Sequence, residues 1–82
     1  MAMIAPAIPK SHFLFSYDEI TKIATAQIKL YMDASRRASG AEARDRRERA
    51  YGVYMGWRAL VETHPDREKF VTDDARLEAM QR

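Results

Sequence analysis

Apolar and polar side chains alternate along residues 16–39 with the period of an α-helix. Ser16 stands three residues before Glu19, as in a capping box, and Phe15 and Ile20 flank this start as in a hydrophobic staple. The pattern predicts an amphipathic helix over 16–39. We expect Gln27, the one polar residue near the centre of the stripe, to lie at its rim. The apolar stripe consists of Ile20, Ile23, Ala24, Gln27, Ile28, Leu30, Tyr31, Ala34 and Ala38.

A second helix is predicted over 41–63. Gly40 suits the left-handed residue that ends a helix, and Ser39 with Glu42 offers a second capping box. The helix should stop before Pro65, because proline disfavours helical backbone at the residue that precedes it. With so short a connection, the two helices are expected to form an antiparallel hairpin.

The C-terminal segment 65–81 has a weaker helical pattern. Thr63 and Asp66 repeat the capping spacing, and Pro65 fits a first helical turn. Asp73 and Asp74 interrupt the apolar face, so two short helical pieces could replace one helix. That face consists of Phe70, Leu77 and Met80, with Val71 at its edge.

Residues 1–15 form an apolar arm. Pro6 and Pro9 favour extended backbone there, and we expect the arm to pack on the core or on a second subunit. The start has no basic region before its apolar stretch, unlike a signal peptide, and no apolar run reaches the length of a membrane span. A cytoplasmic location is expected.

The second helix has two faces of different character. Its core stripe is expected to pack on the first helix and consists of Ala43, Ala50, Val53, Tyr54, Trp57, Leu60 and Val61. The opposite face is small and consists of Gly52, Gly56, Ala59 and Thr63. A glycine inside a helix costs about 1 kcal/mol relative to alanine, so two of them indicate that another backbone packs closely.

Two interpretations of the small face stay open. It could bind a second subunit or a target, or the C-terminal segment of the same chain could fold back onto it. For the first interpretation, aromatic residues and Met outside the core stripe mark an interface. The predicted partner interface is Tyr51, Gly52, Met55, Gly56, Arg58 and Ala59.

Composition adds a reason to expect association. The chain has 82 residues, of which 46% are hydrophobic and 32% charged, and no cysteine. So small a core is marginal alone, and neither disulfides nor thiolate metal sites can supplement it. We therefore expect a homodimer with a four-helix arrangement.

Nucleic-acid binding is the alternative, because the middle of the chain is its basic part, although the net charge of +2 is low for a nucleic-acid-binding module. The arginines of the second helix point in several directions, and Glu42–Arg46 and Asp45–Arg49 are spaced as ion pairs. Those pairs weaken this hypothesis. The candidate nucleic-acid or acidic-partner contacts are Arg36, Arg37, Arg44 and Arg47.

The residues offer little for catalysis. There is no nucleophilic cysteine, no glycine-rich phosphate loop and no metal-ligand spacing, and His12 and His64 are isolated. We expect no catalytic residue, no cofactor and no metal site, and no binding to membranes.

The prediction is an all-α protein: an antiparallel hairpin of two long helices, a short C-terminal helix and an extended apolar N-terminal arm. We expect a non-enzymatic protein–protein interaction module, a small regulator or inhibitor that docks a helical surface on a target protein. Bacterial and phage accessory proteins supply examples of that class.

Overall fold

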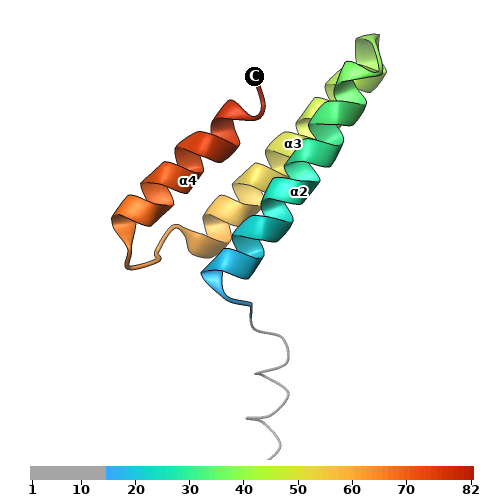
Figure 1. Cartoon of the computed structure of the whole chain (residues 1–82). Helices are drawn as coiled ribbons and strands as arrows, with labels where there is room; N and C mark the ends of the chain where they lie inside the picture. The colour runs from blue at the N-terminus through green and yellow to red at the C-terminus, as the bar shows by residue number, and fades with distance from the viewer. Residues whose placement is uncertain (1–14) are drawn as a thin grey trace, which may run out of the picture.

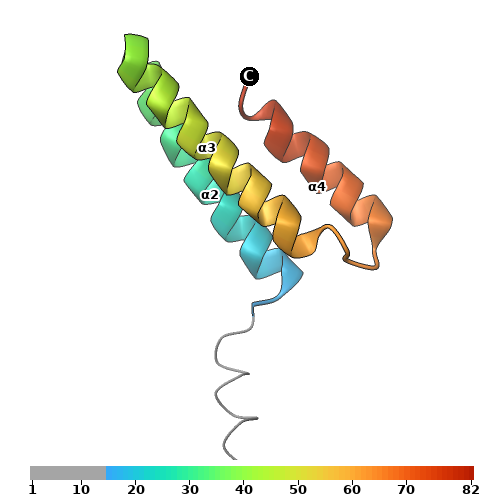
Figure 2. The same ribbon diagram turned by 180° about the vertical axis from the view of Figure 1, so that it is seen from behind.

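The computed structural model describes residues 15–82, so the predicted arm lies outside the described residues except for Phe15. The chain forms α2 (Tyr17–Arg36), α3 (Gly40–Val61) and α4 (Arg67–Ala79). Figure 1 shows α2 and α3 as an antiparallel hairpin with α4 along one side of it, and Figure 2 shows the same arrangement from behind. The predicted all-α hairpin with a short C-terminal helix is confirmed.

The start of α2 agrees with the capping prediction. The Ser16 hydroxyl accepts a hydrogen bond from the backbone N–H of Glu19 at 3.1 Å, and the Glu19 carboxylate accepts one from the N–H of Ser16 at 2.9 Å. This reciprocal pair satisfies two donors that a helix start would otherwise leave without partners. The box therefore fixes the first residue of the hairpin.

The turn between α2 and α3 differs from its prediction at one residue. Gly40 has the expected left-handed backbone, with φ +59°. The Ser39 side chain, however, makes no capping hydrogen bond, so the predicted Ser39–Glu42 box is wrong. A capping box needs ordinary helical backbone directly after the cap, and Gly40 holds that position in the left-handed conformation.

The C-terminal helix begins with Asp66, whose carboxylate accepts a hydrogen bond from the backbone N–H of Lys69 at 3.0 Å. The predicted capping pattern of Thr63 with Asp66, which placed Pro65 in the first turn, is therefore wrong. Of the two alternatives for this segment, one helix is confirmed and two pieces broken near Asp73 and Asp74 is wrong, because α4 runs through both residues. Their carboxylates accept hydrogen bonds from side chains of the hairpin, so both acidic residues lie on the packed face of an unbroken helix.

The core lies where the three helices meet. Ile28, Ala50 and Leu77 have no exposed surface, and Trp57 is 2% exposed, as its place in the core stripe predicted. The Trp57 ring stacks on Phe70 with centroids 5.5 Å apart, which joins α3 to α4. Its indole N–H donates to the Thr21 hydroxyl at 2.8 Å, so the buried nitrogen has a partner.

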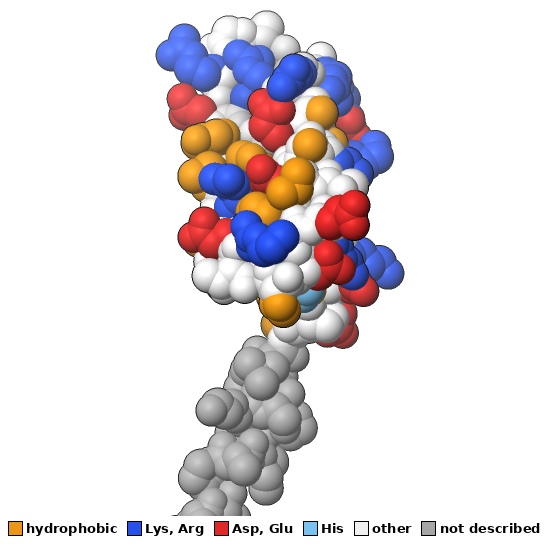
Figure 3. Space-filling model, turned by 90° about the vertical axis from the view of Figure 1, so that its left-hand side faces the viewer, with side chains coloured by type: hydrophobic (Ala, Val, Ile, Leu, Met, Phe, Trp, Pro, Cys, Tyr) orange, Lys and Arg blue, Asp and Glu red, His pale blue; other side chains and the backbone are white. Residues whose placement is uncertain are grey.

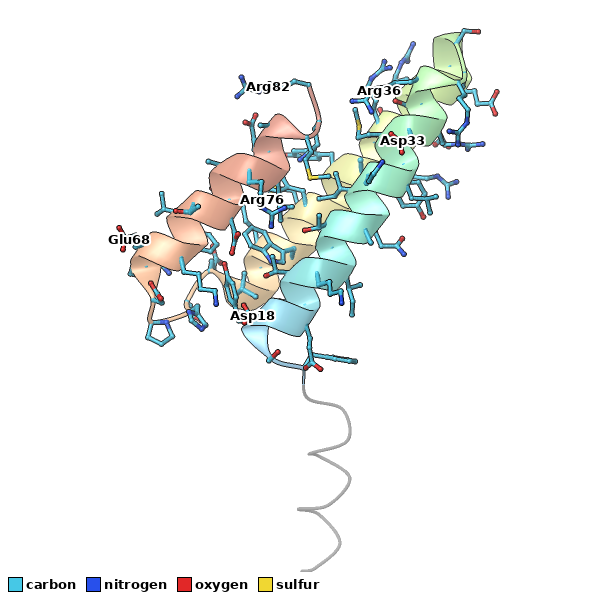
Figure 4. All side chains as sticks on the ribbon, in the orientation of Figure 1. Asp18, Asp33, Arg36, Glu68, Arg76 and Arg82 are labelled. Carbon is cyan, nitrogen blue, oxygen red and sulfur yellow. The ribbon has the colours of Figure 1, made fainter. Side chains whose placement is uncertain are left out.

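The buried side of α2 is rotated from the predicted stripe. The residues that it buries are Thr21, Ala24, Ile28, Met32 and Ser35. Ile23 and Leu30, predicted to be in the stripe, are about half exposed, at 51% and 55%. Both other helices cover the threonine side of α2: Trp57 of α3 donates to the Thr21 hydroxyl, and Arg76 of α4 donates to the Thr25 hydroxyl at 3.3 Å. In Figure 4 Arg76 points from α4 toward α2.

The end of the hairpin at the Arg37–Gly40 turn, here called the tip, projects beyond α4 in Figures 1 and 2. With about 3.6 residues per turn, the 22 residues of α3 exceed the 13 of α4 by about two and a half turns. The opposite end, where α2 begins and α3 ends, is called the base. The two ends of the hairpin therefore differ in what covers them.

Candidate interaction surfaces

The α3 outer surface is formed by five residues of the predicted interface: Tyr51, Gly52, Met55, Gly56 and Ala59. All five are exposed. A methyl group placed on Gly52 or Gly56 would meet no atom within 4 Å. Of the two open interpretations, packing of the C-terminal segment on these glycines is therefore wrong, since α4 packs beside Trp57 and Tyr54 instead.

Arg58, the sixth predicted interface residue, is placed differently. Its guanidinium donates to the Asp74 carboxylate at 2.9 Å, and it lies 5.8 Å from the centre of the Phe70 ring. Asp74 raises the pKa of this guanidinium further, and it also accepts a hydrogen bond from the Tyr54 hydroxyl at 2.7 Å. In this structure Arg58 joins α3 to α4.

A second surface lies between α2 and α3, where the chain leaves an apolar hollow of about 320 Å³. We call this surface, extended along α2 to Leu30, the open face. The residues that line the hollow are Ile20, Ile23, Ala24, Gln27, Val53, Gly56, Trp57 and Leu60. Gly56 belongs to this lining as well as to the α3 outer surface, so the two surfaces meet at that residue.

The open face carries side chains that the sequence placed in the core. Leu60 is 70% exposed, so its assignment to the core stripe of the second helix is wrong, and Val53 is half-buried. Leu30 follows Ile23 by seven residues, which places both on one side of α2. Large exposed apolar side chains gathered on one side of a small protein are typical of an interaction surface or a ligand-binding groove.

The hollow continues toward the base. A neighbouring hollow of about 280 Å³ shares Ile20 and Leu60 with it and is also lined by Phe15, which is 58% exposed. The exposed apolar surface therefore runs from the start of α2 to Leu30. Sequence reasoning missed it, although the unusual width of the apolar stripe on α2 was a usable signal: a stripe packed on one partner is narrower.

The four candidate arginines lie around the tip. Arg36 is bound by Asp33 at 3.1 Å, and both are seen at the upper end of α2 in Figure 4. Arg37, Arg44 and Arg47 are exposed and form no ion pair with another described residue. Figure 3, which looks onto the α4 side, shows basic side chains gathered at the upper end. The tip thus carries positive charge that faces solvent.

The expected ion pairs on α3 are confirmed. Arg46 contacts the Glu42 carboxylate at 3.2 Å, and Arg49 contacts that of Asp45 at 3.1 Å. These exposed pairs contribute little to stability, but they neutralise part of the basic charge of the tip. Only some of its arginines therefore face solvent without an acidic neighbour.

Two tyrosines connect the hairpin to α4. The Tyr17 hydroxyl donates to the Asp73 carboxylate at 2.8 Å, and the Tyr54 hydroxyl donates to that of Asp74. Burial, followed by the hydrogen bond to the carboxylate, raises the pKa of each phenol from 10.0 to about 12. Both phenols therefore keep their protons at neutral pH, and both serve as structural donors.

Histidine and carboxylate chemistry gives no metal candidate in residues 15–82, where no group of three or more His, Asp or Glu side chains could hold an ion. The ring nitrogen Nδ1 of His64 accepts from the backbone N–H of Asp66 at 3.2 Å, and the ring packs on Tyr17. His64 is thus part of the turn before α4. His12 lies outside the described residues.

Within the described part of the chain, no helix has the length and apolar character needed to cross a bilayer. Comparison of the chain with protein-family models, curated proteins and solved structures gives no match.

Proposed function

We propose that this chain is a non-enzymatic protein–protein interaction module that docks the α3 outer surface on a target protein. The observation that supports the proposal is the open space beside Gly52 and Gly56. Two helical glycines cost about 2 kcal/mol in total relative to alanines, and no packing within the described residues offsets this cost. A helix from another polypeptide that packs closely on the two glycines would offset this cost.

The neighbours of the glycines fit this role. Tyr51 is 55% exposed and Met55 is 39% exposed, and both residue types are enriched at protein interfaces. The ring of Tyr51 is held 6.2 Å from that of Tyr54, whose hydroxyl is bound by Asp74. A partly ordered aromatic side chain loses less entropy on binding. The glycines admit the backbone of the target while Tyr51 and Met55 contact its side chains.

A stand-alone binding surface of this kind suits a small regulator or inhibitor, and we place its action in the cytoplasm. Its effect on the target would come from occupying a surface and not from chemistry on it. The homodimer that the sequence favours is compatible with this role, because the α3 outer surface occupies only one side of the hairpin.

The test compares proteins captured by three purified baits: the wild type, Met55→Asp and Val71→Asp. Met55 lies on the α3 outer surface. Val71 is the control, because it is also an exposed apolar residue but lies on α4, where 61% of its surface is exposed. A target retained by the wild type and by Val71→Asp and lost with Met55→Asp is the expected result. Titration calorimetry with that purified target should then show at least a tenfold loss of affinity, which corresponds to about 1.4 kcal/mol. Identical captures by all three baits would contradict the proposal.

The basic tip favours a second candidate, a nucleic-acid-binding regulator. Its support is the exposed group of Arg37, Arg44 and Arg47 beyond the end of α4. Binding through phosphates would weaken steeply with added salt, and an Arg44→Ala, Arg47→Ala double variant would have a shallower salt dependence. Fluorescence anisotropy with labelled DNA and RNA measures both, and no binding at low salt excludes this candidate.

A further inference from the structure

We propose that a second copy of this chain covers the open face, in an antiparallel arrangement with α2 against α2 of the other copy. The inference deepens the proposed function, because it names one protein that the module binds. It rests on three features of the open face: its apolar side chains, their spacing along α2 and the charge of the two hairpin ends.

The first feature is the amount of apolar surface that the hairpin leaves uncovered. Ile23, Leu30 and Leu60 are 51%, 55% and 70% exposed, while α4 covers the more polar side of α2. In a domain of this size the intrachain core alone is small. A helical layer placed over the hollow would bury these three side chains and give the two hairpins one shared core.

The second feature is the spacing of these residues around Gln27. In an antiparallel pair of identical helices, a two-fold axis beside Ala26 and Gln27 places Ile23 of one copy opposite Leu30 of the other, and the reverse. Gln27 of one copy then lies close to Ala26 and Gln27 of the other copy. A side-chain amide both donates and accepts hydrogen bonds, so two glutamines can satisfy each other across the axis.

The position of Gln27 favours a second copy over a different protein on the open face. Gln27 lines the hollow among apolar residues, it is exposed, and its side chain forms no hydrogen bond with another described residue. A single polar residue within an apolar helix interface commonly fixes the register and the orientation of the pair. The two-fold arrangement gives Gln27 this role.

The third feature is charge. The tip half of the hairpin, residues 27–51, has seven basic and four acidic side chains, a net charge of +3. The base half, residues 15–26 and 52–62, has two basic and three acidic ones, a net charge of −1. An antiparallel pair brings each tip onto the base of the other copy, whereas a parallel pair would bring the two basic tips together.

Leu60 fits the same arrangement. It lies at the base end of the open face, where the antiparallel pair brings the tip of the other copy. The aliphatic stems of arginines can cover an apolar side chain while their charged ends stay in water. The most exposed apolar residue of this face is thus covered without an apolar partner.

Single cysteines test the arrangement in the full chain, which has no cysteine of its own. Under mild oxidation Gln27→Cys should form a disulfide-linked dimer. Position 27 lies near the two-fold axis, so its Cα atoms in the two copies should be less than about 7 Å apart, as a disulfide requires. Lys29→Cys is the matched control, since position 29 is exposed on the polar side of the same helix. Ser39→Cys at the tip reports a parallel pair.

The expected result is efficient cross-linking at position 27, with positions 29 and 39 staying monomeric on a non-reducing gel. Preferential linking at position 39 would overturn the antiparallel arrangement. Equal linking at 27 and 29, or none at 27, would overturn the shared open face altogether, and would mean that another segment or a target covers it. The proposed docking of a target depends on Tyr51 and Met55 and is tested by capture, so the two can fail separately.

Discussion

At the scale of single residues, the glycines and aspartates show most clearly what the sequence could predict and what it could not. Gly52 and Gly56 were singled out by their cost in a helix, and the structure shows no neighbour beside them. Asp73 and Asp74 were interpreted as a helix break because their partners, Tyr17 and Tyr54, stand 56 and 20 residues away. Local patterns report the cost of a residue, but the distant group that offsets this cost is visible only in three dimensions.

Replacing Gly52, which lies on the α3 outer surface and does not line the hollow of the open face, should raise stability. Gly52→Ala should raise the free energy of unfolding by about 0.5–1 kcal/mol, because the added methyl meets nothing and alanine favours helix. Urea denaturation followed by circular dichroism measures this change. Ala59→Gly, in the same helix, is the control and should lower stability by a similar amount. A loss of stability with Gly52→Ala would mean that another part of the protein already lies there.

At the scale of elements, local signals determined where helices begin, and tertiary contacts determined which faces they bury. The Ser16–Glu19 box and the Gly40 turn were predictable because they depend on neighbouring residues. The buried side of α2 was not, because the Thr21 hydroxyl accepts from Trp57 of α3 and the Thr25 hydroxyl accepts from Arg76 of α4. The apolar pattern alone cannot show that a polar face will be covered.

The contact of α4 with the hairpin should weaken at alkaline pH. The pKa of Tyr17 and that of Tyr54 are raised from 10.0 to about 12 in the folded protein, so folding favours the protonated phenols. Their contribution to stability is complete below about pH 10. It is lost as the pH rises toward 12, where the unfolded chain gives up these protons first.

Tyrosinate absorbance near 295 nm, recorded against pH, measures this effect. The wild type should show a late-titrating component that shrinks in Tyr54→Phe and again in the Tyr17→Phe, Tyr54→Phe double variant. Tyr51→Phe serves as the control, because Tyr51 is exposed on α3 and forms no hydrogen bond to a described side chain. A late component that persists unchanged in the double variant would contradict the assigned contacts.

At the scale of the whole molecule, the hairpin has one side covered by α4 and another that is open. The composition predicted association but could not locate its surface, because Ile23, Leu30 and Leu60 read as ordinary core positions. On one side of the hairpin, hydrogen bonds join polar side chains to α4, whereas the open face is apolar and has no covering element among the described residues. This difference between the two sides is the basis for assigning the open face to a contact with a second copy.

The mass of the purified protein in solution, determined by light scattering, tests the central claim that a second copy of the chain covers the open face. The wild type should have twice the chain mass of 9.5 kDa, and Ile23→Asp should have that of a single chain with its helix content retained. Val71→Asp, which adds the same charge on α4, should stay dimeric. A wild type that remains a single chain across the accessible concentrations would contradict the account.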